Sequence, residues 1–145
     1  MTIPNAVLIP EVARIVGEGR MVKLRLKGRS MRPFLQDGRD CALLAAPGNP
    51  SEGDVALARI AGDTYVLHRI VAIDGDNVTL QGDGNTTSER CRRCDILAVA
   101  IGFHIAGAEK PCLVSGFKWR AYSRVWAALR PARHYLLAAL GLVGL

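Results

Sequence analysis

Residues 55–81 read VALARIAGDTYVLHRIVAIDGDNVTLQ, and this stretch decides the fold. Apolar and β-branched residues fill three runs, 55–60, 64–73 and 78–81, and short segments containing glycine and aspartate separate them. Runs of this length with such breaks are typical of antiparallel strands joined by tight turns. The pattern predicts a three-stranded meander in the middle of the chain.

The flanking segments extend this β-rich pattern. Apolar residues alternate with lysine and arginine over residues 21–27, which predicts a half-buried strand, and residues 96–105 form another apolar strand candidate. Residues 6–19 place apolar side chains between an early proline and two late glycines, as in a short helix. We therefore expect a small, strongly twisted, mainly β domain with a short N-terminal helix.

The pattern changes after residue 116. Helical spacing separates the apolar residues Trp119, Tyr122, Val125, Trp126 and Leu129, and basic residues fall largely between them. This pattern predicts a basic amphipathic helix, and an apolar tail follows Pro131. We expect residues 1–116 to form the functional domain. The helix at the start of residues 117–145 could pack on that domain, bind an acidic partner, or lie on an anionic membrane surface.

Length and charge narrow the classes of function. A chain of 145 residues with 50% hydrophobic side chains can bury one core. The formal net charge is +6, but five cations and no acid follow residue 116, so subtracting these five leaves +1 for the first 116 residues. A general nucleic-acid-binding surface is therefore not expected.

Membrane and export signals are also weak. No window approaches the roughly 18 consecutive apolar residues that read as a membrane-spanning helix. The first ten residues lack the basic region and long apolar core of a secretory signal. We expect a cytoplasmic protein, with peripheral membrane contact through the C-terminal basic helix as an alternative.

Ser30 follows the strand predicted at residues 21–27. Gly28 permits a sharp bend before it, and Pro33 restricts the backbone after it, so the hydroxyl would lie on a stiff, exposed turn. A serine beside a glycine is by itself usually a turn residue. The segments that follow Ser30 are what favour a nucleophile at this position.

Four short segments occur in a fixed order: S-M-R-P at 30–33, G-D-V at 53–55, H-R-I-V at 68–71 and G-D-G-N at 82–85. Their order resembles the boxes of signal peptidase I and of the wider superfamily that includes LexA-like self-cleaving repressors. The resemblance covers roughly residues 20–105 and implies a β-rich serine peptidase. The N-terminal segment is too short for the helix-turn-helix domain that a repressor would carry.

The resemblance places His68 where the general base belongs. Bacterial signal peptidases and the repressors use a lysine there, whereas the archaeal, sporulating-bacterial and endoplasmic-reticulum types use a histidine. Imidazole has an ordinary pKa of about 6.5 and can accept a proton at neutral pH. On a strand, His68 would share one face with Val66 and Ile70.

The remaining site residues are also implied by the resemblance. Asp83 is expected to orient His68, while Glu89 is the closest match to a second acid of the histidine-type enzymes and Asp95 a weaker one. The Ser30 backbone N–H is the expected oxyanion donor, and at position 28 only a backbone group of Gly28 could assist. Met31 and Pro33 are expected to shape the substrate cleft, and Gly53-Asp54 is a structural segment.

Cys91 and Cys94 form a C-x-x-C pair after the G-D-G-N segment. Cys41 and Cys112 lie far from them in the sequence, so the second close pair of a zinc site is missing. We expect plain thiols, with a local disulfide or a metal site as alternatives.

The sequence therefore predicts a serine endopeptidase that uses Ser30, His68 and Asp83 without a cofactor or metal. By resemblance, its substrate is an extended peptide along a strand edge, within a leader-bearing or signal-bearing peptide or protein, with small side chains before the cleaved bond. Two other classes stay open. One is a catalytically silent peptide-binding module of the same fold, and the other is a metal or redox regulator built on Cys91 and Cys94.

Overall fold

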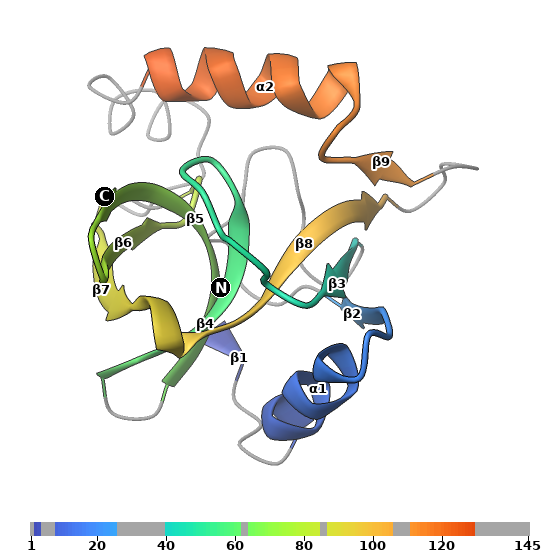
Figure 1. The fold of residues 1–145 in the computed structure, drawn as a ribbon. Helices are drawn as coiled ribbons and strands as arrows, with labels where there is room; N and C mark the ends of the chain where they lie inside the picture. Colours follow the sequence, from blue (N-terminus) through green and yellow to red (C-terminus); the bar gives the residue numbers. More distant parts are fainter. Residues whose placement is uncertain are drawn as a thin grey trace.

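A computed structural model describes most of the chain (Figure 1). The described residues are 2–3, 8–25, 40–61, 64–84, 87–105 and 111–129. Their elements, in chain order, are β1 (Thr2–Ile3), α1 (Leu8–Gly17), β2 (Val22–Arg25), β3 (Cys41–Ala45), β4 (Val55–Ile60), β5 (Thr64–Asp74), β6 (Asn77–Gln81), β7 (Glu89–Arg92), the 3-10 helix η2 (Arg93–Asp95), β8 (Ile96–His104), β9 (Cys112–Leu113) and α2 (Phe117–Ala128).

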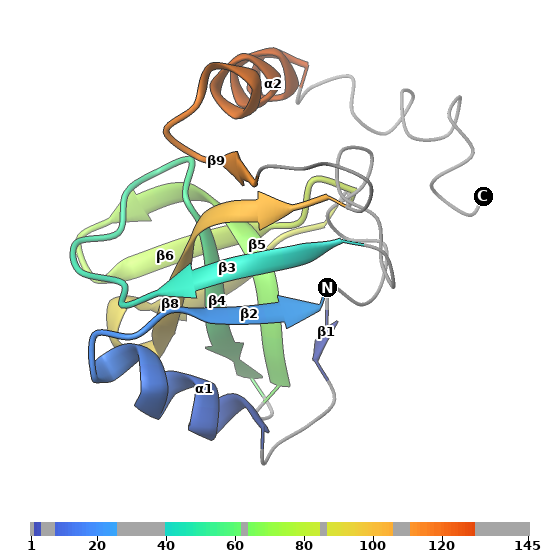
Figure 2. The same ribbon diagram turned by 90° about the vertical axis from the view of Figure 1, so that its right-hand side faces the viewer.

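The strands form one curled antiparallel sheet, seen from two sides in Figures 1 and 2. Its order is β2-β3-β8-β4-β5-β6-β7, with β1 added to β5 and β9 added to β8. The meander β4-β5-β6 lies within this sheet, and β8 joins it to the β2-β3 hairpin. The expected mainly β fold, with one short helix near each end of the described chain, is confirmed.

The predicted elements lie close to the observed ones. The strand expected at 55–60 is β4, that at 64–73 is β5, and that at 78–81 is β6 with one residue added before it. The helix expected within residues 6–19 is α1. Strand β7 had no counterpart in the sequence-based prediction, and its omission matters for the site described below.

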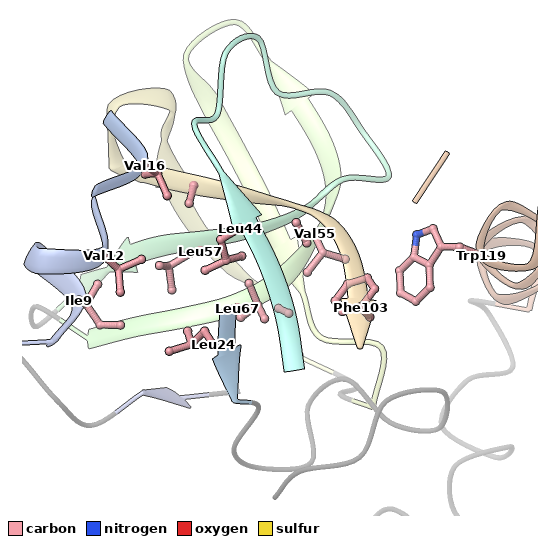
Figure 3. Packing of buried hydrophobic residues seen from close by; sticks show 13 residues of the cluster. Ile9, Val12, Val16, Leu24, Leu44, Val55, Leu57, Leu67, Phe103 and Trp119 are labelled. Carbon is pink, nitrogen blue, oxygen red and sulfur yellow. The ribbon is translucent and has the colours of Figure 1, made fainter. Parts of the chain in front are cut away.

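Two groups of buried apolar side chains stabilise the sheet. The first, drawn in Figure 3, lies under α1 and extends to Phe103 and Trp119. Ile9, Val12 and Val16 enter it from α1, because helical spacing places them on one face. The second group belongs to the meander and consists of Ala56, Ala58, Val66, Ile70, Val78, Leu80 and Ile96. The sheet therefore buries apolar residues on both of its faces over the meander.

Helix α2 covers one end of the sheet through its aromatic face. Trp119 and Trp126 are its buried residues, and the Trp119 ring lies 4.6 Å from the Phe103 ring, centroid to centroid. In the structure, α2 therefore packs on the domain, which is the first of the three roles considered for this helix. Neither α1, with 10 residues, nor α2, with 12, has the length that crossing a bilayer requires, and no other α-helix lies in the described ranges.

Candidate functional site

Strand β5 presents its side chains alternately to the two faces of the sheet. His68 lies on the same face as Val66 and Ile70, which belong to the apolar group of the meander. Arg69 shares the opposite face with Leu67, which belongs to the group under α1 and Trp119. The expectation that His68 shares a face with Val66 and Ile70 is confirmed. Two adjacent polar residues thus enter two separate buried environments.

His68 is 2% exposed, and its Nδ1 lies 2.9 Å from Glu89 Oε2. The strand register explains how a residue 21 positions later reaches it. Glu89 on β7 is opposite Leu80 on β6, and Leu80 is opposite Ile70, which follows His68 by two residues on the same face. The carboxylate therefore approaches His68 diagonally across the sheet.

The environment keeps the His68 ring uncharged at neutral pH. Burial among apolar side chains lowers the pKa of His68 to about 3. Burial also raises the pKa of Glu89, whose side chain is about one quarter exposed. A carboxylate oxygen at Nδ1 favours the tautomer in which Nδ1 carries the hydrogen, so Nε2 presents a lone pair. This form has a lone pair that can accept a proton, although the same burial makes the ring a weaker base than a solvent-exposed imidazole.

The lowered pKa of His68 makes stability depend on pH. The unfolded chain binds a proton at this residue below about pH 6.5 whereas the folded chain does so only near pH 3, so acid favours unfolding. We expect the His68 contribution to the free energy of unfolding to fall by about 2 kcal/mol between pH 7 and pH 5. Urea unfolding of the wild type and of His68→Gln at both pH values measures it.

The comparison with His68→Gln is needed because the raised pKa of Glu89 acts in the opposite direction. Both proteins keep Glu89, so the difference between their pH dependences reports mainly on His68. The wild type is expected to lose more stability than His68→Gln on going to pH 5. Equal losses in the two proteins would contradict the pKa of about 3.

Asp83 has a different partner from the expected one. Its carboxylate accepts two hydrogen bonds from Arg69, from Nε to Oδ1 at 2.8 Å and from Nη2 to Oδ2 at 2.7 Å. Asp83 is fully buried, and its polar contacts are with Arg69 and with helix α2. The prediction that Asp83 orients His68 was therefore wrong. The physical reason is that Arg69 places a cation on the face where Asp83 lies, whereas His68 points to the other face.

Helix α2 completes the surroundings of this ion pair. The Tyr122 hydroxyl donates to Asp83 Oδ2 at 2.7 Å, and Trp126 Nε1 donates to the Asp83 carbonyl oxygen at 3.0 Å. Ser123 Oγ accepts from Arg69 Nη1 at 2.9 Å, and the Arg69 guanidinium lies 5.0 Å from the centre of the Trp119 ring. The aromatic face of α2 thus binds both partners of the pair.

Arg69 also contacts the segment before β4. Its Nη1 donates to the Gly53 carbonyl oxygen at 3.1 Å, and Gly53 has a positive φ of 96° that favours glycine. The Asp54 carboxylate accepts from the Ser51 backbone N–H at 2.9 Å. These contacts shape the turn that leads into β4, in keeping with a structural role for Gly53-Asp54. Although buried, the Arg69 guanidinium has a raised pKa because its hydrogen bonds to Asp83 favour the charged form.

Glu89 and Asp95, the two candidates for a second acidic residue at the site, have different contacts. Glu89 contacts His68, whereas Asp95 lies in η2, 3.4 Å from Arg59 Nη2, and accepts from the Arg92 backbone N–H at 3.0 Å. Glu89 therefore occupies the position expected for Asp83, and Asp95 helps to form the turn after β7. The predicted residues Gly28, Ser30, Met31 and Pro33 lie outside the described residues, so the described part of the site is the His68–Glu89 pair.

Sequence reasoning missed four residues around the site: Arg69, Tyr122, Ser123 and Trp126. Arg69 stands beside the candidate base in an otherwise apolar run, and a cation there requires a buried anion. That signal could have assigned Asp83 to Arg69. On α2, Tyr122 and Trp126 belong to the predicted apolar face, whereas nothing in the sequence marks Ser123 as a partner of Arg69.

The cysteines Cys91 and Cys94 are free thiols, as are Cys41 and Cys112. Cys91 lies on β7, and burial raises the pKa of its thiol to about 11, so it is protonated at neutral pH. Among the described residues, no group of three or more histidine, cysteine or acidic side chains is arranged to hold a metal ion.

No protein-family model matches the chain, and no curated protein matches it either. The likeness to signal peptidases therefore depends on the four short segments alone, and the site must be argued from its own geometry.

Proposed function

We propose that this protein is a serine endopeptidase in which Ser30 is the nucleophile and His68 the general base. The observation that carries the proposal is the buried pair of His68 and Glu89, with 2.9 Å between Nδ1 and Oε2. An uncharged imidazole whose orientation and tautomer are fixed by a carboxylate is the arrangement that a serine nucleophile requires. Glu89 takes the orienting role in this proposal, and Asp83 takes none.

The proposed reaction follows from these roles. The Ser30 hydroxyl attacks the peptide carbonyl carbon while its proton passes to Nε2 of His68, and the ionised Glu89 stabilises the imidazolium that forms. The Ser30 backbone N–H is proposed to donate to the oxyanion. His68 then gives the proton to the leaving amine, and water releases the acyl group from Ser30 in a second step.

The pairing of β1 with β5 shows that an extended segment can bind beside His68. Thr2 is opposite Val66 and Ile3 is opposite Tyr65, so β1 occupies this edge and a substrate can add to β5 there only by displacing β1. Strand addition of this kind supplies backbone hydrogen bonds whatever the side chains are. We propose that the substrate is a leader-bearing or signal-bearing peptide or protein that binds in extended form.

A serine-directed acylating probe, such as a fluorophosphonate, tests the proposal. We expect the wild type to be labelled on one serine and Ser30→Ala to lose at least about 100-fold in labelling rate, because the hydroxyl that His68 activates is gone. Ser51→Ala is the matched control, since Ser51 is an exposed turn serine, and it should be labelled like the wild type. Labelling is followed by intact-protein mass spectrometry.

Two outcomes would contradict the peptidase. Labelling of Ser30→Ala at the wild-type rate would place the reactive group elsewhere. A wild type that resists the probe under conditions that label a known serine peptidase, yet still binds extended peptides, would instead be a peptide-binding module.

A further inference from the structure

Helix α2 has a second face that points away from the sheet. Its inward face is formed by Trp119, Tyr122, Ser123 and Trp126, whose contacts hold the Arg69–Asp83 pair. The outward face is a separate surface at the end of the molecule opposite α1 (Figure 1). Substitutions on the outward face can therefore be made without removing the contacts of the inward one.

The middle of the outward face is apolar. Phe117 is 88% exposed and Val125 is 59% exposed. Ala121 lies between them, because residues four apart occupy one side of a helix. Leu113 on β9, 46% exposed, extends the apolar surface near Phe117, and the two residues line the same shallow hollow. A large aromatic side chain in this position gains little from folding, so it favours an external apolar partner.

Basic residues flank this apolar strip. Arg120 and Arg124 follow one side of it, both exposed, and Lys118 lies on the other side. The 12 residues of α2 include no aspartate or glutamate, so Arg120 and Arg124 have no acidic partner within the helix. A partner that fits this surface therefore has negative charges for the cations and an adjacent apolar layer for the apolar strip.

We propose that the outward face of α2 docks on an anionic lipid surface. The helix lies parallel to the membrane, Phe117 and Val125 enter the region between head groups and acyl chains, and Arg120 and Arg124 bind lipid phosphates. Interfacial helices bind in this way, with apolar burial and electrostatic attraction acting together. The proposal does not depend on the peptidase activity.

The composition of the face favours lipid over the other acidic partners. A nucleic acid would use the cations but leave Phe117 and Val125 exposed. A hollow of about 450 Å³ lies along this face, and its lining combines apolar and cationic side chains: Phe117, Arg120, Ala121, Arg124 and Val125. A bilayer interface offers acyl chains to the apolar side chains and phosphates to the cations, so it satisfies both kinds of side chain. The observations on this face thus fit a lipid surface best.

Co-sedimentation of the full chain with vesicles tests the proposal. Vesicles of phosphatidylcholine with 30% phosphatidylglycerol should bind the protein, and vesicles of phosphatidylcholine alone should bind it at least about 10-fold more weakly. Raising the salt concentration from 0.1 M to 0.5 M should weaken the binding, because salt screens exposed charges.

Paired variants separate the two contributions. Arg120→Gln with Arg124→Gln should weaken binding by about 25-fold, since each cation near an anionic surface contributes a factor of about five. Phe117→Ser with Val125→Ser should weaken it by a similar factor through lost apolar burial. The control pair is Arg20→Gln with Met21→Ser, which removes an exposed cation and a 62% exposed apolar residue near α1 and should leave binding unchanged.

Several results would overturn the proposal. Equal binding to neutral and anionic vesicles, no binding to either, or losses as large in the control pair would each do so. Tighter binding to heparin or DNA than to vesicles, unaffected by Phe117→Ser with Val125→Ser, would identify a polyanion instead. Loss of self-association by that pair in size-exclusion chromatography, without vesicle binding, would identify a second copy of the chain as the partner.

Discussion

Asp83→Ala is expected to lower the free energy of unfolding by about 3 to 5 kcal/mol. The substitution leaves the buried Arg69 guanidinium without its carboxylate, at a position where water cannot replace it. It also removes the acceptor for the Tyr122 hydroxyl, so helix α2 loses one of its polar contacts with the sheet. Urea or guanidinium unfolding followed by far-UV circular dichroism measures the change.

The matched control is Asp76→Ala, which removes an exposed carboxylate from the turn between β5 and β6 and should cost less than about 0.5 kcal/mol. Arg69→Met, alone and combined with Asp83→Ala, completes a double-mutant cycle. Because the double variant leaves no uncompensated charge, it should be less destabilised than the two single changes added together. A loss below about 1 kcal/mol in Asp83→Ala would show that the ion pair does not stabilise the fold.

His68→Gln is expected to reduce kcat for peptide hydrolysis by about 10²- to 10⁴-fold, because glutamine keeps polar side-chain atoms but cannot act as a base. KM should change little, since the substitution leaves the backbone of the sheet in place. Glu89→Gln should reduce kcat less, by roughly tenfold or more, because the imidazole remains but loses the charge that stabilises its protonated form. Steady-state hydrolysis of an extended fluorogenic peptide measures these values.

The same assay separates the roles of the two acidic residues. Asp83→Asn should lower stability but change kcat much less than Glu89→Gln when both are assayed well below their unfolding temperatures. His104→Gln is the control for loss of a histidine, because His104 lies at the end of β8, outside the His68–Glu89 pair. Full activity in His68→Gln would remove the basis of the proposed mechanism.

The meander could be predicted because each of its strands is rich in apolar or β-branched residues and each turn carries glycine with aspartate. Helix α1 could be predicted for a similar reason, since Ile9, Val12 and Val16 mark one side of a helix. In these segments, the residues that the sequence pattern marks as apolar positions are the ones that the fold buries. The aromatic side of α2 packs on the sheet for the same reason.

Strand β7 could not be predicted from such patterns. It reads Glu-Arg-Cys-Arg, and its charged, half-exposed residues give no apolar alternation, as is common for a strand at the edge of a sheet. Without β7, only the resemblance connected Glu89 with the site, and the pairing that places Glu89 opposite Leu80 and near His68 could not be derived from the sequence pattern.

The partner of Asp83 could not be predicted either. Alternation along β5 predicts that His68 and Arg69 point to opposite faces, but Asp83 was assigned to His68 by resemblance, because the sequence does not show which face Asp83 reaches. Pairing of strands decides which face each acid reaches: Gln81, two residues before Asp83, is opposite Arg69, whereas Leu80 is opposite Ile70. Such pairing is a property of the folded sheet and is not contained in local propensity.

The adjacency of His68 and Arg69 also bears on how the chain reaches its native state. If β5 paired with β4 in a register shifted by one residue, every side chain on β5 would change faces. The Arg69 guanidinium would then enter the second apolar group, which belongs to the meander. Both pairs, His68 with Glu89 and Arg69 with Asp83, would be broken at once. The two polar pairs thus disfavour a one-residue shift of β5 against β4, because the shifted sheet would leave buried polar groups without partners.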